Sequence, residues 1–351
     1  MLEQISDGQL GALIGLLAGI ALGLAARMGR FCTMGAIEDK LYGENDTRFR
    51  MWGVVLGTAL IGTFTLSALG LFDMSEAIYY QAPFSPVASI LGGLIFGYGM
   101  ALAGNCGFGA LAQLGGGDMR YFVVVMVLGV TSMAVLSGPF AQYRLDLIAA
   151  TTMDTGTIGY PQLLSDATGI PPSAFGIALG LVFLAITLAN ADFRSARTEI
   201  FWSVIVGLAV TFAWGGTYYV FTNGFDEIQV EAMTYAAPVG EALIYTMTAS
   251  AGGINFGVGS VTGVVVGAFI GSMMKGHFRW EACEDPRELR RQIIGGGLMG
   301  VGAAFALGCS IGQGLSAMSV LSFGAPLALV SILIGAAIGL RQIMFGMTWW
   351  R

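Results

Sequence analysis

The chain has 351 residues, of which 55% are hydrophobic, 11% are charged and 54 are glycines, and its formal net charge is −6. This composition excludes a water-soluble globular domain and indicates an all-α polytopic membrane protein. Glycine at this level lets apolar helices approach one another closely. Membrane lipid is the expected environment, and no nucleic-acid partner, cofactor or metal is expected.

Nine apolar runs are long enough to cross roughly 30 Å of hydrocarbon. They cover residues 10–26, 51–72, 87–104, 121–140, 172–190, 198–222, 241–274, 292–308 and 324–340. Glycines around Asn255 interrupt the seventh run, so we expect two half-helices within one crossing there. The residues before the first run lack the basic segment of a signal peptide, and no cleavage is expected.

Three of the four cysteines lie in glycine-rich breaks of these runs. Residues 97–109 and 300–312 share the pattern G-x-G-x-A-x-A-x-x-C-x-x-G at a constant offset of 203, with Cys106 and Cys309 at its centre. Cys32 lies in a shorter version of the pattern, and Asn255 is a weak candidate for its counterpart. So few cysteines in so long a chain predict free thiols rather than a disulfide framework.

The basic residues predict the orientation of the chain. When alternate loops are placed on the same side, fifteen of the sixteen basic residues lie on one face and only Arg144 lies on the other. By the positive-inside rule the N-terminus is periplasmic and the C-terminus cytoplasmic. The two cysteine repeats then emerge on opposite sides, which predicts a single transmembrane domain of two inverted halves, about 1–145 and 172–351, with an outer loop 146–171 between them.

Non-helical backbone at membrane depth is stable only where protein buries it or a polar cavity solvates it, so the breaks mark a candidate solute path. A helix that starts after a break directs N–H groups at an anion. Thiols add weak, soft hydrogen-bond donors. We therefore predict that Cys32, Cys106 and Cys309 contact a substrate. The polar residues within or beside the breaks either line the path or satisfy loop backbone: Asn105, Ser310, Gln313 and Asn255.

Simpler interpretations remain open for several residues. Buried cysteines and the 18 methionines often serve only as core packing. Cys283 lies in a charged loop and is expected to be incidental. The glycine patterns do not indicate a nucleotide site, because no strand and soluble α/β unit accompanies them.

The segments around Cys32 (GRFCTMGA), Cys106 (AGNCGFG) and Cys309 (LGCSIGQG) resemble the three cysteine motifs of the bacterial YeeE/YedE sulfur-transport family. The resemblance covers essentially the whole chain. It implies an hourglass-shaped inner-membrane protein whose central constriction carries the three cysteines and passes thiosulfate inward. It also implies a cytoplasmic sulfur-carrier partner of the TusA type.

Three functions are therefore open. The first is uptake of a small sulfur-containing anion, with thiosulfate as the leading candidate. The second is a membrane-bound sulfurtransferase that carries a persulfide on one of the cysteines. The third is transport of a selenium compound or a soft metal, because thiolate and thioether ligands together select Cu(I).

Overall fold

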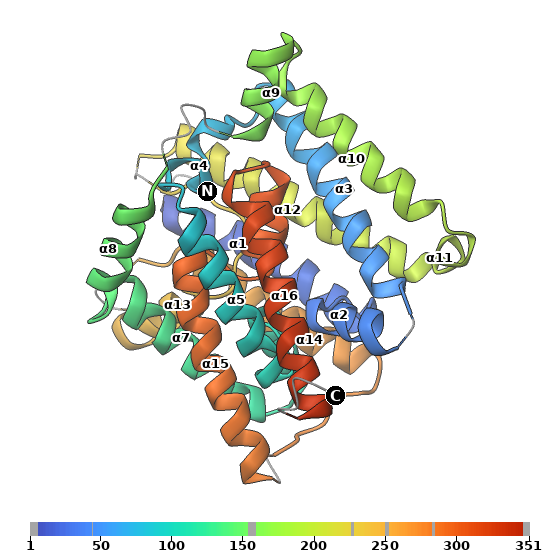
Figure 1. Cartoon of the computed structure of the whole chain (residues 1–351), viewed down its shortest axis with the longest axis vertical. Helices are drawn as coiled ribbons and strands as arrows, with labels where there is room; N and C mark the ends of the chain where they lie inside the picture. Colours follow the sequence, from blue (N-terminus) through green and yellow to red (C-terminus); the bar gives the residue numbers. More distant parts are fainter. Residues whose placement is uncertain are drawn as a thin grey trace.

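The computed structural model describes residues 6–43, 45–153, 159–225, 228–249, 253–282 and 285–346, and these residues form an all-helical structure (Figure 1). The long helices are α1 (Asp7–Met28), α3 (Thr47–Ala68), α5 (Pro86–Ala103), α7 (Arg120–Leu136), α10 (Pro172–Leu188), α12 (Arg197–Asn223), α14 (Phe256–Met274), α15 (Pro286–Ala306) and α16 (Gly324–Phe345). The shorter ones are α2 (Thr33–Tyr42), η2 (Met74–Glu76), α4 (Ile78–Gln81), α6 (Gly107–Gly115), α8 (Ala141–Thr151), α9 (Tyr160–Thr168), α11 (Ala191–Ser195), α13 (Ala237–Thr248) and the π-helix η3 (Gly312–Ala317).

The described helices account for the predicted membrane spans in part. Six spans are long and apolar enough to cross a membrane, and up to eight if two bent helix pairs each count as one span. The bent pairs are α7 with α8, at 60°, and α9 with α10, at 115°. The predicted run 292–308 lies in α15, but the first turns of that helix are charged, and it is not among these spans. The predicted count of nine therefore exceeds what length and composition support.

The prediction of two half-helices in one crossing at 241–274 was wrong. Helix α14 has 19 residues and is a candidate span by itself, whereas α13 is a separate helix of 12 residues. Helix α13 packs against both α14 and α7. The glycine-rich stretch before Asn255 therefore separates two helices rather than interrupting one.

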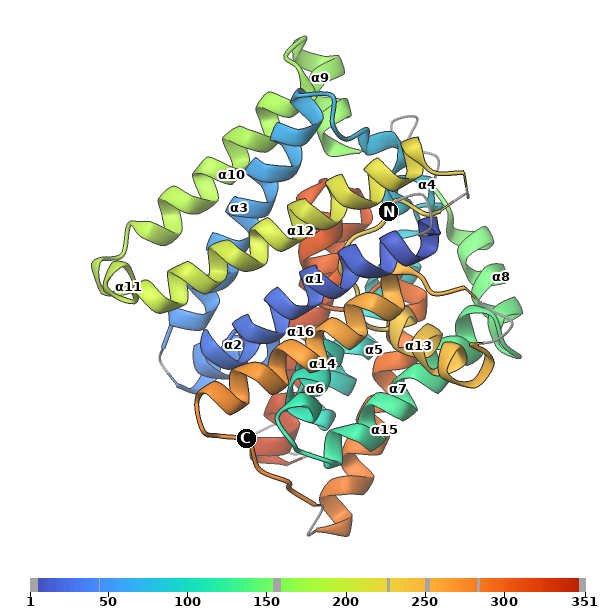
Figure 2. The ribbon, with the colours of Figure 1, turned by 180° about the vertical axis from the view of Figure 1, so that it is seen from behind.

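Close helix pairs organise the molecule. Helix α5 packs between α15 and α16, and α1 packs along α14; Figure 2 shows α1 and α14 side by side. Glycines permit this approach, since a Cβ on Gly19 would lie 2.3 Å from the backbone oxygen of Ser260, and one on Gly263 would lie 2.3 Å from that of Leu16. Helix α3 packs against both α10 and α12.

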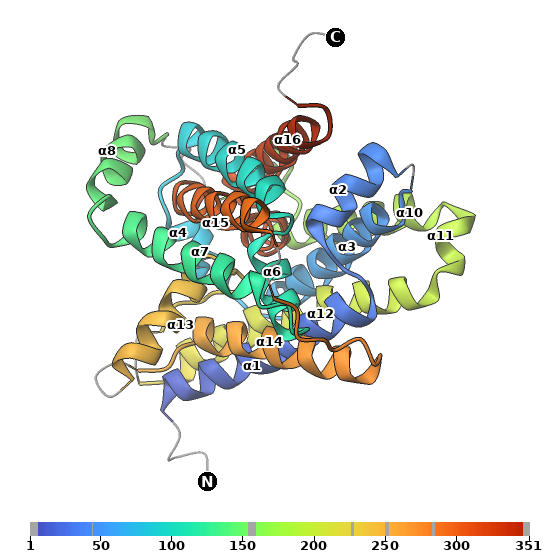
Figure 3. The same cartoon turned by 90° about the horizontal axis from the view of Figure 1, so that it is seen from below.

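The short helix α6 lies near the middle of the molecule when it is seen from below (Figure 3). It packs against α14 and α7 and also contacts α1. Most of its residues are buried, including Phe108 and Leu111. The break that precedes α6 is therefore placed inside the protein rather than against lipid, as non-helical backbone at this depth requires.

Candidate functional site

Cys32 lies in the break between α1 and α2. Arg30 has a left-handed backbone (φ 57°), and Cys32 is extended (φ −154°, ψ 130°). The Cys32 Sγ accepts a hydrogen bond from the Gly35 N–H at 3.4 Å. The thiol therefore caps the N-terminus of α2. Its S–H donates to Asn105 Oδ1, 3.5 Å away, and the side chain is half-buried.

Cys106 occupies the same position in the break between α5 and α6. Helix α5 ends at Gly104, whose φ of 79° suits a residue without a Cβ. The buried Cys106 Sγ accepts a hydrogen bond from the Gly109 N–H at 3.4 Å and so caps α6. Its S–H donates to Thr33 Oγ1 at 3.8 Å.

Cys309 follows α15 after a sharper change of direction. Leu307 has a φ of 56°, and the next residue is Gly308, with a φ of 154°. The buried Cys309 Sγ accepts hydrogen bonds from the Gly312 N–H at 3.4 Å and from the Tyr235 N–H at 3.3 Å. It also lies 3.8 Å from Thr234 Oγ1.

All three thiols therefore share one local geometry, in which the sulfur accepts the N–H of the residue three positions later. The sequence analysis predicted breaks at these cysteines but not this use of the sulfur. Cys32 and Cys106 use the hydrogen as a weak donor toward Asn105 and Thr33. Both are also N-cap residues, so the positive ends of the α2 and α6 dipoles lie beside their sulfur atoms.

Hydroxyl groups connect the three breaks. Thr33 Oγ1, which accepts from Cys106, donates to Ser310 Oγ at 3.4 Å. Asn105, whose Oδ1 accepts from Cys32, donates through Nδ2 to the Tyr121 hydroxyl at 2.9 Å. Residues far apart in the sequence thus form two short polar chains inside an apolar core, Cys32–Asn105–Tyr121 and Cys106–Thr33–Ser310.

The structure brings most of the predicted site residues together. Asn105 and Ser310 are buried, and each belongs to one of these two polar chains. The buried Gln313 donates from Nε2 to the carbonyls that end α15, those of Ala306 at 2.7 Å and Leu307 at 3.0 Å, and its Oε1 has no partner among the described residues.

Asn255 is not part of the cluster. Its Oδ1 caps α14 through the Val258 N–H, and its Nδ2 donates to Glu241. It lies at the start of α14, beside the first turn of α1, where a Cβ on Gly8 would contact Ile254. Cys32 follows the opposite end of α1. Cys283, which was expected to be incidental, lies outside the described residues.

Sequence reasoning missed Thr33, Tyr79, Thr234 and Tyr235. Tyr79 OH and Thr234 Oγ1 both lie beside Gly312, next to Cys309. The repeat offset supplied a signal that was not used, because adding 203 to position 32 gives 235. For Thr33 the only signal in the sequence was its position directly after Cys32.

A basic cavity of about 390 Å³ opens beside Cys32. Its lining includes Arg27, Arg30, Arg48, Lys275, His277 and a single acidic residue, Glu38, together with Asn105. Two of these bases also hold helix ends: Arg27 donates to the last carbonyls of α6, and Lys275 donates to those of α1. The cavity therefore offers positive charge next to the Cys32 thiol.

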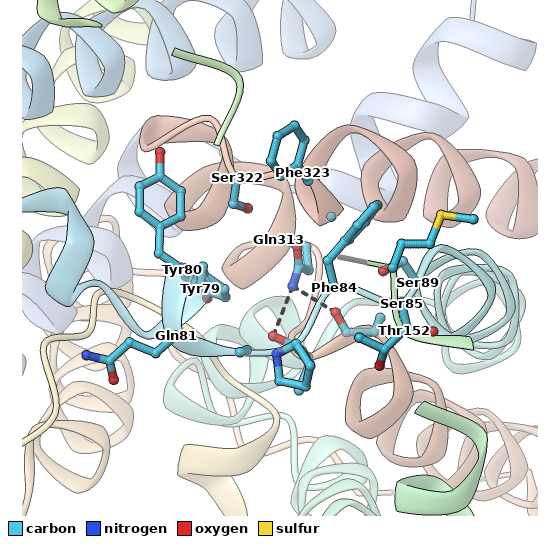
Figure 4. A pocket seen from close by; sticks show the side chains of 16 residues that line it. Tyr79, Tyr80, Gln81, Phe84, Ser85, Ser89, Thr152, Gln313, Ser322 and Phe323 are labelled. Carbon is cyan, nitrogen blue, oxygen red and sulfur yellow. Dashed lines mark hydrogen bonds between the residues drawn. The ribbon is translucent and has the colours of Figure 1, made fainter. Parts of the chain in front are cut away.

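Two further cavities lie beside the break of Cys309. A neutral cavity of about 500 Å³ is lined by residues without charge, among them Tyr79, Gln313 and Ser322 (Figure 4). In Figure 4 the Gln313 amide turns toward the carbonyls at the end of α15. An acidic cavity of about 160 Å³ is lined by Glu231, Glu241 and Thr234 among others.

Within the described ranges, no group of three or more His, Cys, Asp or Glu side chains is placed to hold a metal ion. The basic cavity adjoins Cys32, whereas the two cavities beside the break of Cys309 have no base among the described residues that line them.

Known proteins resemble the chain over most of its length. A family model described as sulphur transport matches residues 28–338. The chain is 28% identical to the thiosulfate transporter TsuA of Escherichia coli strain K12, over 92% of both proteins. It is 25% identical to the protein of the same name from Spirochaeta thermophila, over 92% of this chain and 96% of that protein. The chain therefore belongs to the sulphur transport family, the YeeE/YedE family whose cysteine motifs it carries.

Proposed function

We propose that this protein takes up a small sulfur-containing anion, most specifically thiosulfate, through a path lined by Cys309, Cys106 and Cys32. The single observation that carries the proposal is the shared geometry of the three thiols. Each sulfur accepts the N–H of the residue three positions later. Cys32 and Cys106 donate their S–H to Asn105 and Thr33, and Cys309 lies 3.8 Å from the Thr234 hydroxyl oxygen. Membership of a sulphur transport family and relatives named thiosulfate transporter support the choice of substrate.

The contacts suggest how an anion passes. The S–H groups of Cys32 and Cys106 donate over 3.5 and 3.8 Å, so these are weak interactions that an anion's oxygen or sulfur atoms replace at little cost. Thr33 and Ser310 supply further hydroxyls between the thiols. A path needs contacts that are favourable enough for entry and weak enough for release. Neutral thiols meet both demands, whereas a buried arginine would hold the anion.

The path runs, in this proposal, through two inverted halves that narrow at the thiols like an hourglass. The contacts of four glycines support this. A Cβ on Gly92 would lie 2.7 Å from the Gly302 oxygen, and one on Gly295 would lie 2.6 Å from the Gly99 oxygen. Adding 203 to Gly92 and Gly99 gives Gly295 and Gly302, so α5 and α15 meet through equivalent residues.

Helix packing supports the same symmetry. The contact of α1 with α14 has its counterpart in that of α12 with α3, and the contact of α5 with α16 in that of α15 with α7. This correspondence pairs α1 to α7 with α12 to α16, so we propose that the second half starts at α12. Helix α10, which packs on α3, then stands outside the repeat.

We further propose that the basic cavity faces the cytoplasm of a bacterial inner membrane. The positive-inside rule supports this orientation, because most of the lining charges of that cavity are basic. Substrate then enters from the neutral and acidic cavities and leaves past Cys32. A cytoplasmic sulfur carrier of the TusA type is the proposed acceptor at the basic mouth.

Radiolabelled thiosulfate uptake tests the proposal in cells that lack other uptake routes. We expect Cys106→Ser and Cys309→Ser each to reduce uptake at least tenfold. Serine preserves the helix cap and therefore the fold, so the loss would report the thiol itself. Cys283→Ser is the matched control and should retain uptake.

Wild-type uptake by the Cys309→Ser protein would refute the path. A persulfide retained on Cys106 or Cys309 after thiosulfate exposure, found by mass spectrometry in a protein that takes up no label, would favour the sulfurtransferase instead.

A further inference from the structure

Tyr235 lies between the two thiols of the repeat. Its backbone N–H donates to Cys309 Sγ at 3.3 Å. Its ring lies beside the ring of Phe108, with centroids 5.5 Å apart, and its carbonyl oxygen would lie 3.0 Å from a Cβ on Gly107. Phe108 and Gly107 follow Cys106 directly, so Tyr235 joins the break of Cys309 to the start of α6.

The hydroxyl of Tyr235 has no hydrogen-bond partner among the described residues. The residue has no exposed surface, so this hydroxyl is fully buried. A buried hydroxyl without a partner destabilises a protein and calls for an explanation. A ligand or a water molecule that accepts its hydrogen bond would remove this loss of stability.

The repeat gives Tyr235 a defined place. Adding the offset of 203 to Cys106 gives Cys309, and adding the same offset to Cys32 gives Tyr235. Asn255, the counterpart expected from the sequence, is at the far end of α1 instead. The four positions 32, 106, 235 and 309 then form two equivalent pairs, three of them thiols and one a phenol.

We propose that the Tyr235 hydroxyl is a fourth contact for the transported anion and donates a hydrogen bond to one of its oxygen atoms between Cys309 and Cys106. This inference rests on the proposed transport function. A phenol is a stronger and harder donor than a thiol. It therefore suits the oxygen-bearing end of a sulfur oxyanion, while the thiols suit its sulfur atom.

The test compares Tyr235→Phe with Tyr98→Phe in reconstituted vesicles. Each variant removes one hydroxyl and keeps the aromatic ring. Tyr235→Phe also keeps the backbone N–H that donates to Cys309. The Tyr98 hydroxyl donates to Gln342 Oε1 at 2.6 Å and lies off the path, so Tyr98→Phe is the matched control.

We expect Tyr235→Phe to raise the KM for thiosulfate about tenfold, the size of effect that the loss of one hydrogen bond to a charged ligand produces. Its melting temperature should be unchanged or higher, because the variant buries no unsatisfied hydroxyl. Tyr98→Phe should keep the wild-type KM. This combination separates a ligand contact from a structural role, which would lower the melting temperature.

A wild-type KM in Tyr235→Phe, in a protein that transports thiosulfate, would overturn the role of Tyr235 alone. The same set is assayed with sulfite and sulfate. If the wild type transports one of these in place of thiosulfate, the substrate assignment fails, and the KM for that anion decides the role of Tyr235. A wild type that transports none of them would overturn both proposals.

Discussion

Several side chains in this protein use one hydrogen-bonding atom to hold the backbone and keep another for a weaker contact or for none. The three cysteine sulfur atoms accept helix N–H groups, and the S–H groups of Cys32 and Cys106 make only long, weak contacts that a ligand could replace. Gln313 uses both amide hydrogens on the carbonyls that end α15, and its oxygen has no partner in the described part of the chain. Local capping and substrate contact are thus compatible in the same side chain.

Glu231 raises the opposite question, because an ionised carboxylate beside the proposed path would repel an anion. It lines the acidic cavity with Glu241 and Tyr79, and no base is among the lining residues. Burial away from water raises the pKa of Glu231 from 4.5 to about 8, and the negative charge of Glu241 is the second, smaller cause. The side chain is therefore largely protonated near neutral pH, which removes most of the repulsion.

This shift predicts a pH-dependent stability. The folded protein binds a proton at Glu231 that the unfolded chain releases, so the associated stability is complete below pH 4.5 and is lost as pH rises through about 8. Glu231→Gln keeps a neutral side chain and should flatten the decline of the melting temperature between about pH 4.5 and pH 8. Glu241→Gln is a useful comparison, because removal of that charge should shift the decline to lower pH. Parallel melting curves for wild type and Glu231→Gln would contradict the prediction.

Helices and their breaks were predictable to different degrees. Apolar length located the helices, and glycine-rich cysteine motifs located the breaks at Cys32, Cys106 and Cys309. The same signals misassigned the break before Asn255, because α13 and α14 turned out to be separate helices. Hydropathy also cannot show that the charged first turns of α15 belong to the same helix as its apolar end.

The site itself was predictable only where a motif recurred. Asn105 and Ser310 adjoin the repeated cysteines and were found with them. Thr33 and Tyr235 reach the site by tertiary packing, through contacts 277 and 74 residues away along the chain. Neither carries a local pattern, so only the three-dimensional arrangement, or the offset of 203 for Tyr235, identifies it.

The close pairing of α5 and α15 leads to a prediction at the scale of helices. A Cβ on Gly302 would lie 2.4 Å from Phe96 N and 2.6 Å from the Gly92 oxygen, where the backbone cannot easily move. Gly302→Ala should therefore destabilise the protein by about 1–3 kcal/mol, a typical cost of overpacking. Thermal unfolding in detergent, followed by size-exclusion chromatography, measures this loss.

Gly297 provides the control on the same helix. A Cβ there would approach nothing closer than 3.8 Å, so Gly297→Ala should leave the melting temperature unchanged or slightly raised. Equal effects of the two substitutions would show that helix propensity, rather than the contact between α5 and α15, decides stability.

At the scale of the whole molecule, charge gathers where helix ends meet. Arg120 pairs with Asp118 at 2.7 Å and also lies 3.7 Å from Glu281 and 3.6 Å from Glu288. Lys275 donates to the last carbonyls of α1, beside Arg27. The first set of contacts ties the start of α7 to α15, and the second ties the end of α14 to the end of α1 beside the basic cavity. Among the described residues, the cavities beside the break of Cys309 are lined either by no charged side chain or by carboxylates without a base.

This division predicts the orientation of the chain, which labelling can test. Tyr143 of α8 and Trp280 of the segment before α15 are 71% and 73% exposed. They lie near opposite ends of α7, because α8 follows the last residue of α7, whereas Arg120 at its start lies beside Glu281, the neighbour of Trp280. Each is replaced by cysteine in a Cys283→Ser background, whose remaining thiols are buried or half-buried. A membrane-impermeant maleimide should label Tyr143→Cys in intact spheroplasts and Trp280→Cys only after permeabilisation, since the positive-inside rule places the basic end in the cytoplasm. The Cys283→Ser parent measures background labelling, and the reverse pattern would place the basic cavity outside the cytoplasm and overturn the proposed orientation.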